Sequence, residues 1–294
     1  MTELTFTPTL ARRLAVTRQR LAGPQVEATP DGIMKVFRDL GCVQIDPIRA
    51  VERTQYLTLW SRLGNYDRAH LDSLLWQEKQ LFEYWAHAAS IVLTEDFPIH
   101  QTQMRSFSEN NTAGWGRRIR DWVAANQSFR QYILDELRQR GPLFPNQLED
   151  RSVQAWQSGG WTAGRNVTVM LSFLWETGEI TVVERKGLRK KWGLLEEHLP
   201  QWRNFEALPE AEVVRRAAQK SLRALGVGTA KHIENHFIRK CYPGLDAALT
   251  RLTAKKIIVP ASIRDSDSTA SKFIRPKSSA NTATTSCPFY TASG

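Results

Sequence analysis

The chain has 294 residues, a formal net charge of +10 and 41% hydrophobic residues, which is typical of a globular protein with one large domain or several small ones. No stretch approaches the about 18 apolar residues that a membrane span needs, and the N-terminus lacks the basic-then-apolar order of a secretory signal. These features exclude membrane and secreted proteins and predict a cytoplasmic one. The positive charge favours a polyanionic partner such as nucleic acid, although a basic enzyme without such a partner would have the same composition.

The first predicted module covers residues 1–110 and contains two helical patterns. In PDGIMKVFRDLG, Asp31 can cap the start of a helix and Gly41 its end, and apolar residues recur between them at helical spacing, at Ile33, Val36, Phe37 and Leu40. The apolar pattern of residues 68–85 predicts a second long helix, which would bury Leu71, Leu74, Leu75 and Phe82.

A short strand is predicted at GCVQIDP, directly after the first of these helices. Alternation places Val43 and Ile45 on one face and Gln44 and Asp46 on the other, and Pro47 ends the strand. An amide and a carboxylate two residues apart can be a solvated strand edge or part of an active site. Spacing alone does not decide between these two interpretations.

The second predicted module, residues 111–205, has the clearest pattern. Helices are predicted at 117–125, 129–140 and 165–180, with a short helical stretch at 144–150. Two strand-like segments, ITVVER and RKKWGLL, flank a turn at Lys186 and Gly187. Three helices followed by a two-stranded hairpin is the order of a winged helix.

A weaker version of this pattern recurs in the third predicted module, residues 206–260. There GVGTAKH is predicted as a turn between two helices, because its glycine spacing does not match a phosphate-binding loop. Residues 261–294 are rich in Ser and Thr and lack apolar periodicity, which predicts a disordered or aberrant tail. The predicted fold class is therefore mainly α with small β wings, built from tandem winged-helix modules.

Basic residues gather in three clusters that could neutralise DNA phosphates. The cluster on the predicted wing, whose position favours DNA contact, consists of Arg185, Lys186, Arg189, Lys190 and Lys191. The second consists of Arg117, Arg118 and Arg120 beside Trp115 and Trp122, and the third of Arg215, Arg216, Lys220 and Arg223. For the second and third clusters a solvated helix face is an equally good explanation, and the tryptophans are interpreted as core residues.

The common signatures of catalytic and cofactor sites do not occur. The sequence has no HExxH helix, no GxxxxGK[ST] loop, no GxSxG elbow and no CxxC pair. Its three cysteines are far apart, which does not match a metal site, so we predict neither metal nor cofactor. His87, in EYWAHAAS, is by itself interpreted as a packed and hydrogen-bonded histidine.

The Gln44 and Asp46 pair has a possible chemical task. A carboxylate and an amide together can orient one water, and the carboxylate can stabilise positive charge that develops on a nearby carbon. That is enough to hydrolyse an N-glycosidic bond whose base is already a cation, such as N7-alkylated guanine, because this leaving group needs no acid. It is too little to expel an ordinary base. From the residues alone, a structural role for the pair stays open.

A family resemblance supports the catalytic interpretation. The runs LGCVQIDPIRAVERTQYLTLWSRLGNYD and LFEYWAHAAS resemble the winged-helix DNA glycosylases of the YcaQ and AlkZ type, over about residues 8–260. The triplet Gln44-Ile45-Asp46 resembles the YcaQ-like branch, since the AlkZ-like branch has two glutamines. The resemblance implies that Asp46 activates the attacking water and stabilises the sugar cation, that Gln44 positions the water, and that His87 lies in the pocket.

The same resemblance implies double-stranded DNA with alkylated bases or interstrand crosslinks as the partner, and we expect a monomer. Proteins of this family usually continue into a C-terminal β-rich portion, so a C-terminally truncated or frame-shifted member is expected. The alternative is a non-enzymatic winged-helix DNA-binding protein, such as a transcription regulator. Tandem winged helices and the positive charge fit both, but a regulator has no need of Gln44 and Asp46 beside a motif with His87.

Overall fold

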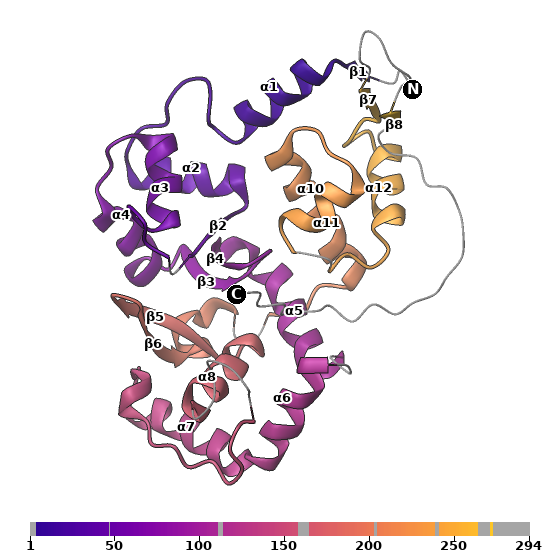
Figure 1. Ribbon diagram of the computed structural model, residues 1–294. Coiled ribbons are helices and arrows are strands. Elements are labelled where there is room, and N and C mark those ends of the chain that lie inside the picture. Colours follow the sequence, from indigo (N-terminus) through magenta and orange to yellow (C-terminus); the bar gives the residue numbers. More distant parts are fainter. Residues whose placement is uncertain are drawn as a thin grey trace.

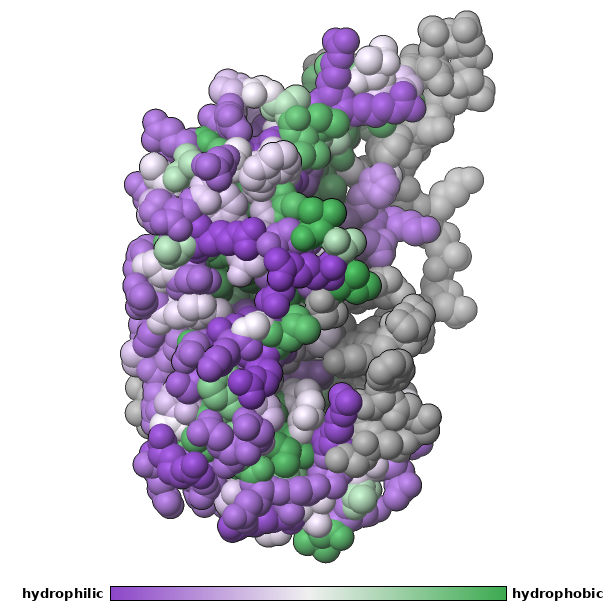
Figure 2. Space-filling model, turned by 60° about the vertical axis from the view of Figure 1, so that its left-hand side comes forward, coloured by the Kyte–Doolittle hydropathy of each residue, from purple (hydrophilic) through white to green (hydrophobic). Residues whose placement is uncertain are grey.

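The computed structural model describes residues 4–46, 48–110, 114–157, 165–202, 205–238, 241–263 and 271–272. These residues are mainly helical and form two three-stranded sheets and one two-stranded sheet. Among them, no helix combines the length and the apolar character that crossing a membrane requires. Figure 2 shows one face of the molecule, which is largely hydrophilic, with hydrophobic residues in small separate groups.

The N-terminal part packs helices against a small antiparallel sheet whose strand order is β2-β4-β3 (Figure 1). Its elements in chain order are α1 (Pro8–Arg18), α2 (Pro30–Leu40), β2 (Cys42–Gln44), α3 (Thr54–Leu63), α4 (Arg68–Asp72), a π-helical turn (Ser73–Gln77), β3 (Leu81–Trp85) and β4 (Ala89–Leu93). Helix α2, strand β2, further helices and the β3–β4 hairpin therefore follow one another, and β2 pairs with the hairpin through β4.

Helix α2 confirms the first predicted helix but is capped by a different residue. The Thr29 hydroxyl accepts a hydrogen bond from the Gly32 N–H at 3.1 Å, so Asp31 lies in the first turn instead of at the cap. Pro30 at the first helical position explains the shift, because its missing N–H is not needed there. Gly41 ends the helix with φ +86°, as expected, and β2 follows at once.

The predicted helix over residues 68–85 is wrong in its second half. Helical structure ends at Gln77, and Leu81–Trp85 form strand β3. Leu81, Phe82, Glu83 and Tyr84 are all buried, with at most 2% of each residue exposed. A surface helix buries one stripe, whereas a strand between two cores buries both faces, so the apolar spacing of this segment was misleading.

The β2-β4-β3 sheet separates two hydrophobic cores. One core, shared with α2, α3 and α4, contains Val43 and Ile91 on one face of the sheet. The other core contains Cys42 and Val92 on the opposite face and continues through the rest of the molecule. Since Gln44 has the same parity as Cys42 along the strand, its side chain belongs to the face that is turned toward the middle and C-terminal parts.

The middle part is helical and ends in a hairpin. It comprises α5 (Phe97–Asn110), α6 (Gly114–Ala125), α7 (Gln127–Arg140), a 3-10 turn (Pro145–Gln147), α8 (Asn166–Glu176), β5 (Ile180–Lys186), β6 (Arg189–Leu194), α9 (Leu195–His198) and a 3-10 turn (Pro200–Trp202). The predicted helices and hairpin are confirmed, although α8 ends at Glu176 instead of at residue 180 and the stretch at 144–150 is only a 3-10 turn. Leu143 bridges to Trp192 in β6, so this part repeats the order seen in the N-terminal part.

The C-terminal part consists of α10 (Glu210–Leu225), α11 (Ala230–His236) and α12 (Leu245–Ala254). Residues 226–229 form the turn between the first two helices, as predicted. Strand β7 (Ala261–Ile263) pairs in parallel with β1 (Leu4–Phe6) and antiparallel with β8 (Ser271–Lys272). Of the predicted tail, residues 261–263 and 271–272 form these two strands, and residues 264–270 and 273–294 lie outside the described part.

Candidate active site

Gln44 and His87 are brought together by the β2-β4-β3 sheet. Gln44 is the last residue of β2, and His87 lies in the turn between β3 and β4. The Ile45 N–H donates to the Ala89 carbonyl at 2.8 Å, which extends the pairing of β2 with β4 by one residue. His87 Nε2 then lies 3.3 Å from Gln44 Oε1 across 43 residues of sequence.

The other ring nitrogen of His87 faces Cys42, a residue to which the sequence alone assigns no role. His87 Nδ1 lies 3.6 Å from the Sγ of Cys42, which is a buried free thiol. Cys42 and Gln44 are two residues apart on β2, so they share one face of the sheet and both meet the imidazole. His87 is therefore hydrogen-bonded, as its sequence context predicts, and its partners are two residues of the candidate site.

Asp46 follows the end of β2 and is partly exposed. Its Oδ1 accepts a hydrogen bond from the Ile48 N–H at 2.8 Å, which holds the carboxylate at the start of the next loop. The nearby arginines have other partners: Arg49 pairs with Glu52 at 3.3 Å, and Arg53 donates to the Gly187 carbonyl at 3.1 Å. Within the described residues, no salt bridge joins Asp46 to a cationic side chain.

This arrangement offers two chemical functions at the end of one strand. Asp46 can accept a proton and can stabilise a developing cation through space. Gln44 offers an amide group whose carbonyl oxygen faces His87. Among the described residues, no group of three or more His, Cys, Asp or Glu side chains could hold a metal ion.

The β5–β6 hairpin reaches the loop that follows Asp46. The hydrogen bond from Arg53 to Gly187 joins this loop to the hairpin turn, and Figure 1 shows the hairpin beside the β2-β4-β3 sheet. A second link is the buried ion pair of Glu83 with Arg185, in which Nη2 donates to Oε2 at 2.7 Å. The hairpin is therefore anchored to β3, the strand that leads into the turn with His87.

The five basic residues predicted on the wing differ in exposure and in their partners. Lys186 and Arg189 are exposed near the hairpin turn. Arg185 is held by Glu83, and the Nζ of Lys190 lies 4.0 Å from the ring centroid of Trp175 and 5.0 Å from that of Trp192. Burial lowers the pKa of Lys190 to about 8. Lys191 forms a salt bridge with Glu184 at 2.9 Å.

The other two basic clusters have internal partners as well. Arg117 and Arg118 are exposed on α6, and Arg118 donates to the Gln157 carbonyl at 2.8 Å. On α10, Arg215 and Arg216 both pair with Glu212, and Lys220 pairs with Asp96 at 2.5 Å. Trp122 is a core residue, as interpreted from the sequence, and the side chain of Trp115 lies outside the described part.

The comparison with protein families decides which family the chain represents. The family model described as DNA glycosylase AlkZ-like matches residues 37–285, which include the candidate site and most of the chain. The chain belongs to the AlkZ-like DNA glycosylase family. The match extends beyond residue 260, at which the sequence resemblance ends.

One solved AlkZ-like structure is similar to this chain. It is the Streptomyces sahachiroi DNA glycosylase AlkZ, which matches with a TM-score of 0.62 at 15% sequence identity. The match covers 88% of this chain and 68% of that one. At this identity the comparison supports the fold, which is mainly helical with small sheets in both proteins.

Sequence reasoning missed two residues beside the site of this AlkZ-like chain. Cys42 could have been found, since alternation along β2 puts it on the face of Gln44. Glu83 could not, because its partner Arg185 is 102 residues away and no local pattern indicates the pair. The residue spacing also gave no sign that Arg185 and Lys190 are turned inward.

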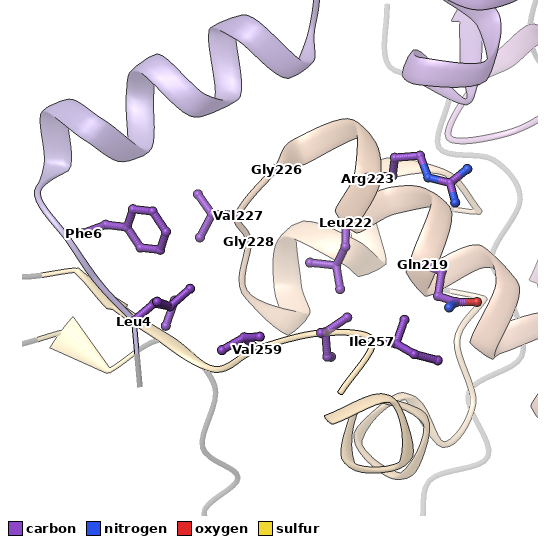
Figure 3. Close-up of a pocket in the computed structure, with 12 residues that line it drawn as sticks. Leu4, Phe6, Gln219, Leu222, Arg223, Gly226, Val227, Gly228, Ile257 and Val259 are labelled. Carbon is purple, nitrogen blue, oxygen red and sulfur yellow. The ribbon is translucent and has the colours of Figure 1, made fainter. Parts of the chain in front are cut away.

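Two cavities of the AlkZ-like chain lie apart from Gln44, Asp46 and His87. One, of about 330 Å³, is lined by Leu4 and Phe6 of the N-terminal segment, which face residues of α10 and of the segment after α12 (Figure 3). The other, of about 350 Å³, lies between the loop after Asp46 and the hairpin and includes Arg53, Glu83 and Arg185. Neither cavity is lined by a predicted catalytic residue.

Proposed function

We propose that this chain hydrolyses the N-glycosidic bond of purines that alkylation, as at N7, has converted into cations in duplex DNA. Asp46 and Gln44 are the catalytic residues, and the reaction uses neither metal nor cofactor. The observation that carries the proposal is an Asp46 carboxylate with no described salt bridge, two residues after the Gln44 whose amide meets His87, in a member of a DNA glycosylase family. A transcription regulator has no need of this arrangement.

The reaction balances with these groups alone. As the bond between the sugar C1′ and the base nitrogen breaks, its electron pair neutralises the cationic base, which leaves without a proton. The sugar becomes an oxocarbenium-like cation, and the Asp46 carboxylate stabilises its charge. Water adds to C1′ and gives its proton to Asp46. Gln44 orients this water through its amide, and an abasic sugar remains in the DNA.

Several finer features form part of the same proposal. The Gln44-Ile45-Asp46 triplet supports assignment to the YcaQ-like branch, and interstrand crosslinks are proposed as further substrates. The repeated order of helices and hairpin supports tandem winged-helix modules over residues 1–110 and 111–205, followed by an incomplete third module over residues 206–260, in a protein that acts as a monomer. Within such modules the β5–β6 hairpin is the wing, and its exposed Lys186 and Arg189, together with Arg117 and Arg118 of α6, contact DNA phosphates.

The direct test is incubation of the purified protein with duplex DNA that carries N7-alkylguanine, followed by detection of the free base. We expect base release from the alkylated duplex and none from the unmodified duplex, because an uncharged guanine is a poor leaving group without an acid. Strong preference for one undamaged sequence over random DNA, without base release, would instead identify a regulator.

The proposed wing contacts predict a change in salt dependence. For Lys186→Ala or Arg189→Ala we expect weaker binding to any duplex, and the slope of log K against log salt should fall by about 0.9 for each lost phosphate contact. The measurement is fluorescence anisotropy at several salt concentrations. Lys191→Ala is the matched control, because Lys191 already pairs with Glu184. Equal slopes for all three variants and the wild type would contradict the wing assignment.

A further inference from the structure

The contacts of His87 connect three side chains in a row. Cys42 Sγ lies 3.6 Å from His87 Nδ1, and His87 Nε2 lies 3.3 Å from Gln44 Oε1. The Cys42 thiol is buried, and the imidazole lies between it and the amide that the proposed function assigns to the reacting water. The row therefore leads from the core of the sheet to the candidate site.

We propose that Cys42 and His87 are positioning residues that orient the Gln44 amide, with the Cys42 S–H donating to His87 Nδ1 and His87 Nε2–H donating to Gln44 Oε1. The amide NH₂ of Gln44 is then turned toward the reacting water. The catalytic part of this inference rests on the proposed function, whereas the hydrogen-bond order itself does not.

The positions of the hydrogens on the three groups support this direction of the hydrogen bonds, from Cys42 through His87 to Gln44. Burial raises the pKa of the Cys42 thiol to about 12, so Sγ carries its hydrogen at neutral pH and can donate. A neutral imidazole has one donor and one acceptor nitrogen, so a bond accepted at Nδ1 leaves the hydrogen on Nε2. An amide oxygen can only accept, which matches the position of Gln44 Oε1 against Nε2.

The opposite direction of the two hydrogen bonds would require weaker acceptors. His87 Nδ1–H would have to donate to a thiol sulfur, which is a weak acceptor, while the amide of Gln44 would have to turn over to donate to Nε2. Ser90 is also a hydrogen-bond partner of the Cys42 sulfur, but the hydrogen of its hydroxyl goes to the Ala88 carbonyl at 3.0 Å. The thiol-to-imidazole direction therefore uses the stronger acceptor at each step.

The orientation of the amide has a mechanistic consequence. An outward NH₂ donates a hydrogen bond to the water oxygen while the Asp46 carboxylate accepts one of the water hydrogens. Together they restrict the rotation of the water and leave a lone pair for C1′. Without Cys42 the imidazole could exchange tautomers, and the amide would spend part of its time turned over.

The test reads the tautomer directly and needs no DNA. In protein with ¹⁵N-labelled histidine at neutral pH, we expect the His87 ring to carry its hydrogen on Nε2, with its signals assigned by their loss in His87→Gln. Cys42→Ala should produce a mixture of tautomers, Cys42→Ser should keep the Nε2–H form, and Val43→Ala is the matched control on the other face of β2. An Nδ1–H tautomer or an imidazolium in the wild type, or an unchanged tautomer in Cys42→Ala, would overturn the proposal.

Single-turnover excision provides the second readout. We expect Cys42→Ala to slow excision about three- to tenfold, the range of one lost hydrogen bond, with DNA affinity unchanged. Cys42→Ser should recover most of the rate. Equal rates for Cys42→Ala and Val43→Ala would contradict the positioning role. If the tautomer is as expected but no base is released by the wild type, the proposed function fails while the hydrogen-bond order stands.

Discussion

Asp46→Asn should bind alkylated duplex DNA almost as well as the wild type and excise the damaged base about 10² to 10⁴ times more slowly. The substitution removes the proton acceptor and the negative charge that faces the sugar cation. It keeps the shape of the side chain and an oxygen that can accept from the Ile48 N–H. The measurements are anisotropy for binding and single-turnover base release for excision.

The neighbouring carboxylate of Glu52 offers a matched control for Asp46. Glu52 lies in the same loop but pairs with Arg49 and Arg68, at 3.3 and 2.8 Å. Glu52→Gln should therefore change the excision rate far less than Asp46→Asn. Equal losses of binding and excision in Asp46→Asn would indicate that the carboxylate has a structural role.

Glu83→Ala should lower the free energy of unfolding by about 3–5 kcal/mol. Glu83 is 2% exposed, and its loss leaves the mostly buried Arg185 guanidinium without a counter-charge. The ion pair joins β3 to the hairpin. Two further hydrogen bonds connect β3 to α8: Trp175 Nε1–H donates to the Glu83 carbonyl at 3.1 Å, and the Tyr84 hydroxyl donates to the Glu176 carbonyl at 2.8 Å. Urea denaturation measures the effect.

A surface pair on the same hairpin provides the control for Glu83. Glu184 is half exposed and pairs with Lys191, so Glu184→Ala should cost only about 0–1 kcal/mol. Replacing both Glu83 and Arg185 by methionine should restore part of the stability, because the Arg185 guanidinium is then no longer buried without its partner. A loss below 1 kcal/mol in Glu83→Ala would show that Arg185 finds water or another partner.

Local patterns predicted much of this fold because they depend on near neighbours. Helix α2, the middle helices and the β5–β6 hairpin follow from apolar spacing and from turn residues such as Gly41 and Gly187. The helix predicted through Leu81–Trp85 failed because its burial depends on the two cores that β3 separates. Those cores are assembled from segments that are remote in sequence, so no local pattern could indicate them.

By itself, the sequence determined that Gln44 and Asp46 have the same parity along a short strand, since backbone alternation has a period of two. Only the tertiary structure decided which groups meet them. Strand pairing places His87 between Cys42 and Gln44. In the loop after Asp46, Arg49 pairs with Glu52 and Arg53 donates to the Gly187 carbonyl. Likewise the count of basic residues was known from the sequence, but the packing of β3 against the hairpin directs Arg185 inward and leaves Lys186 exposed.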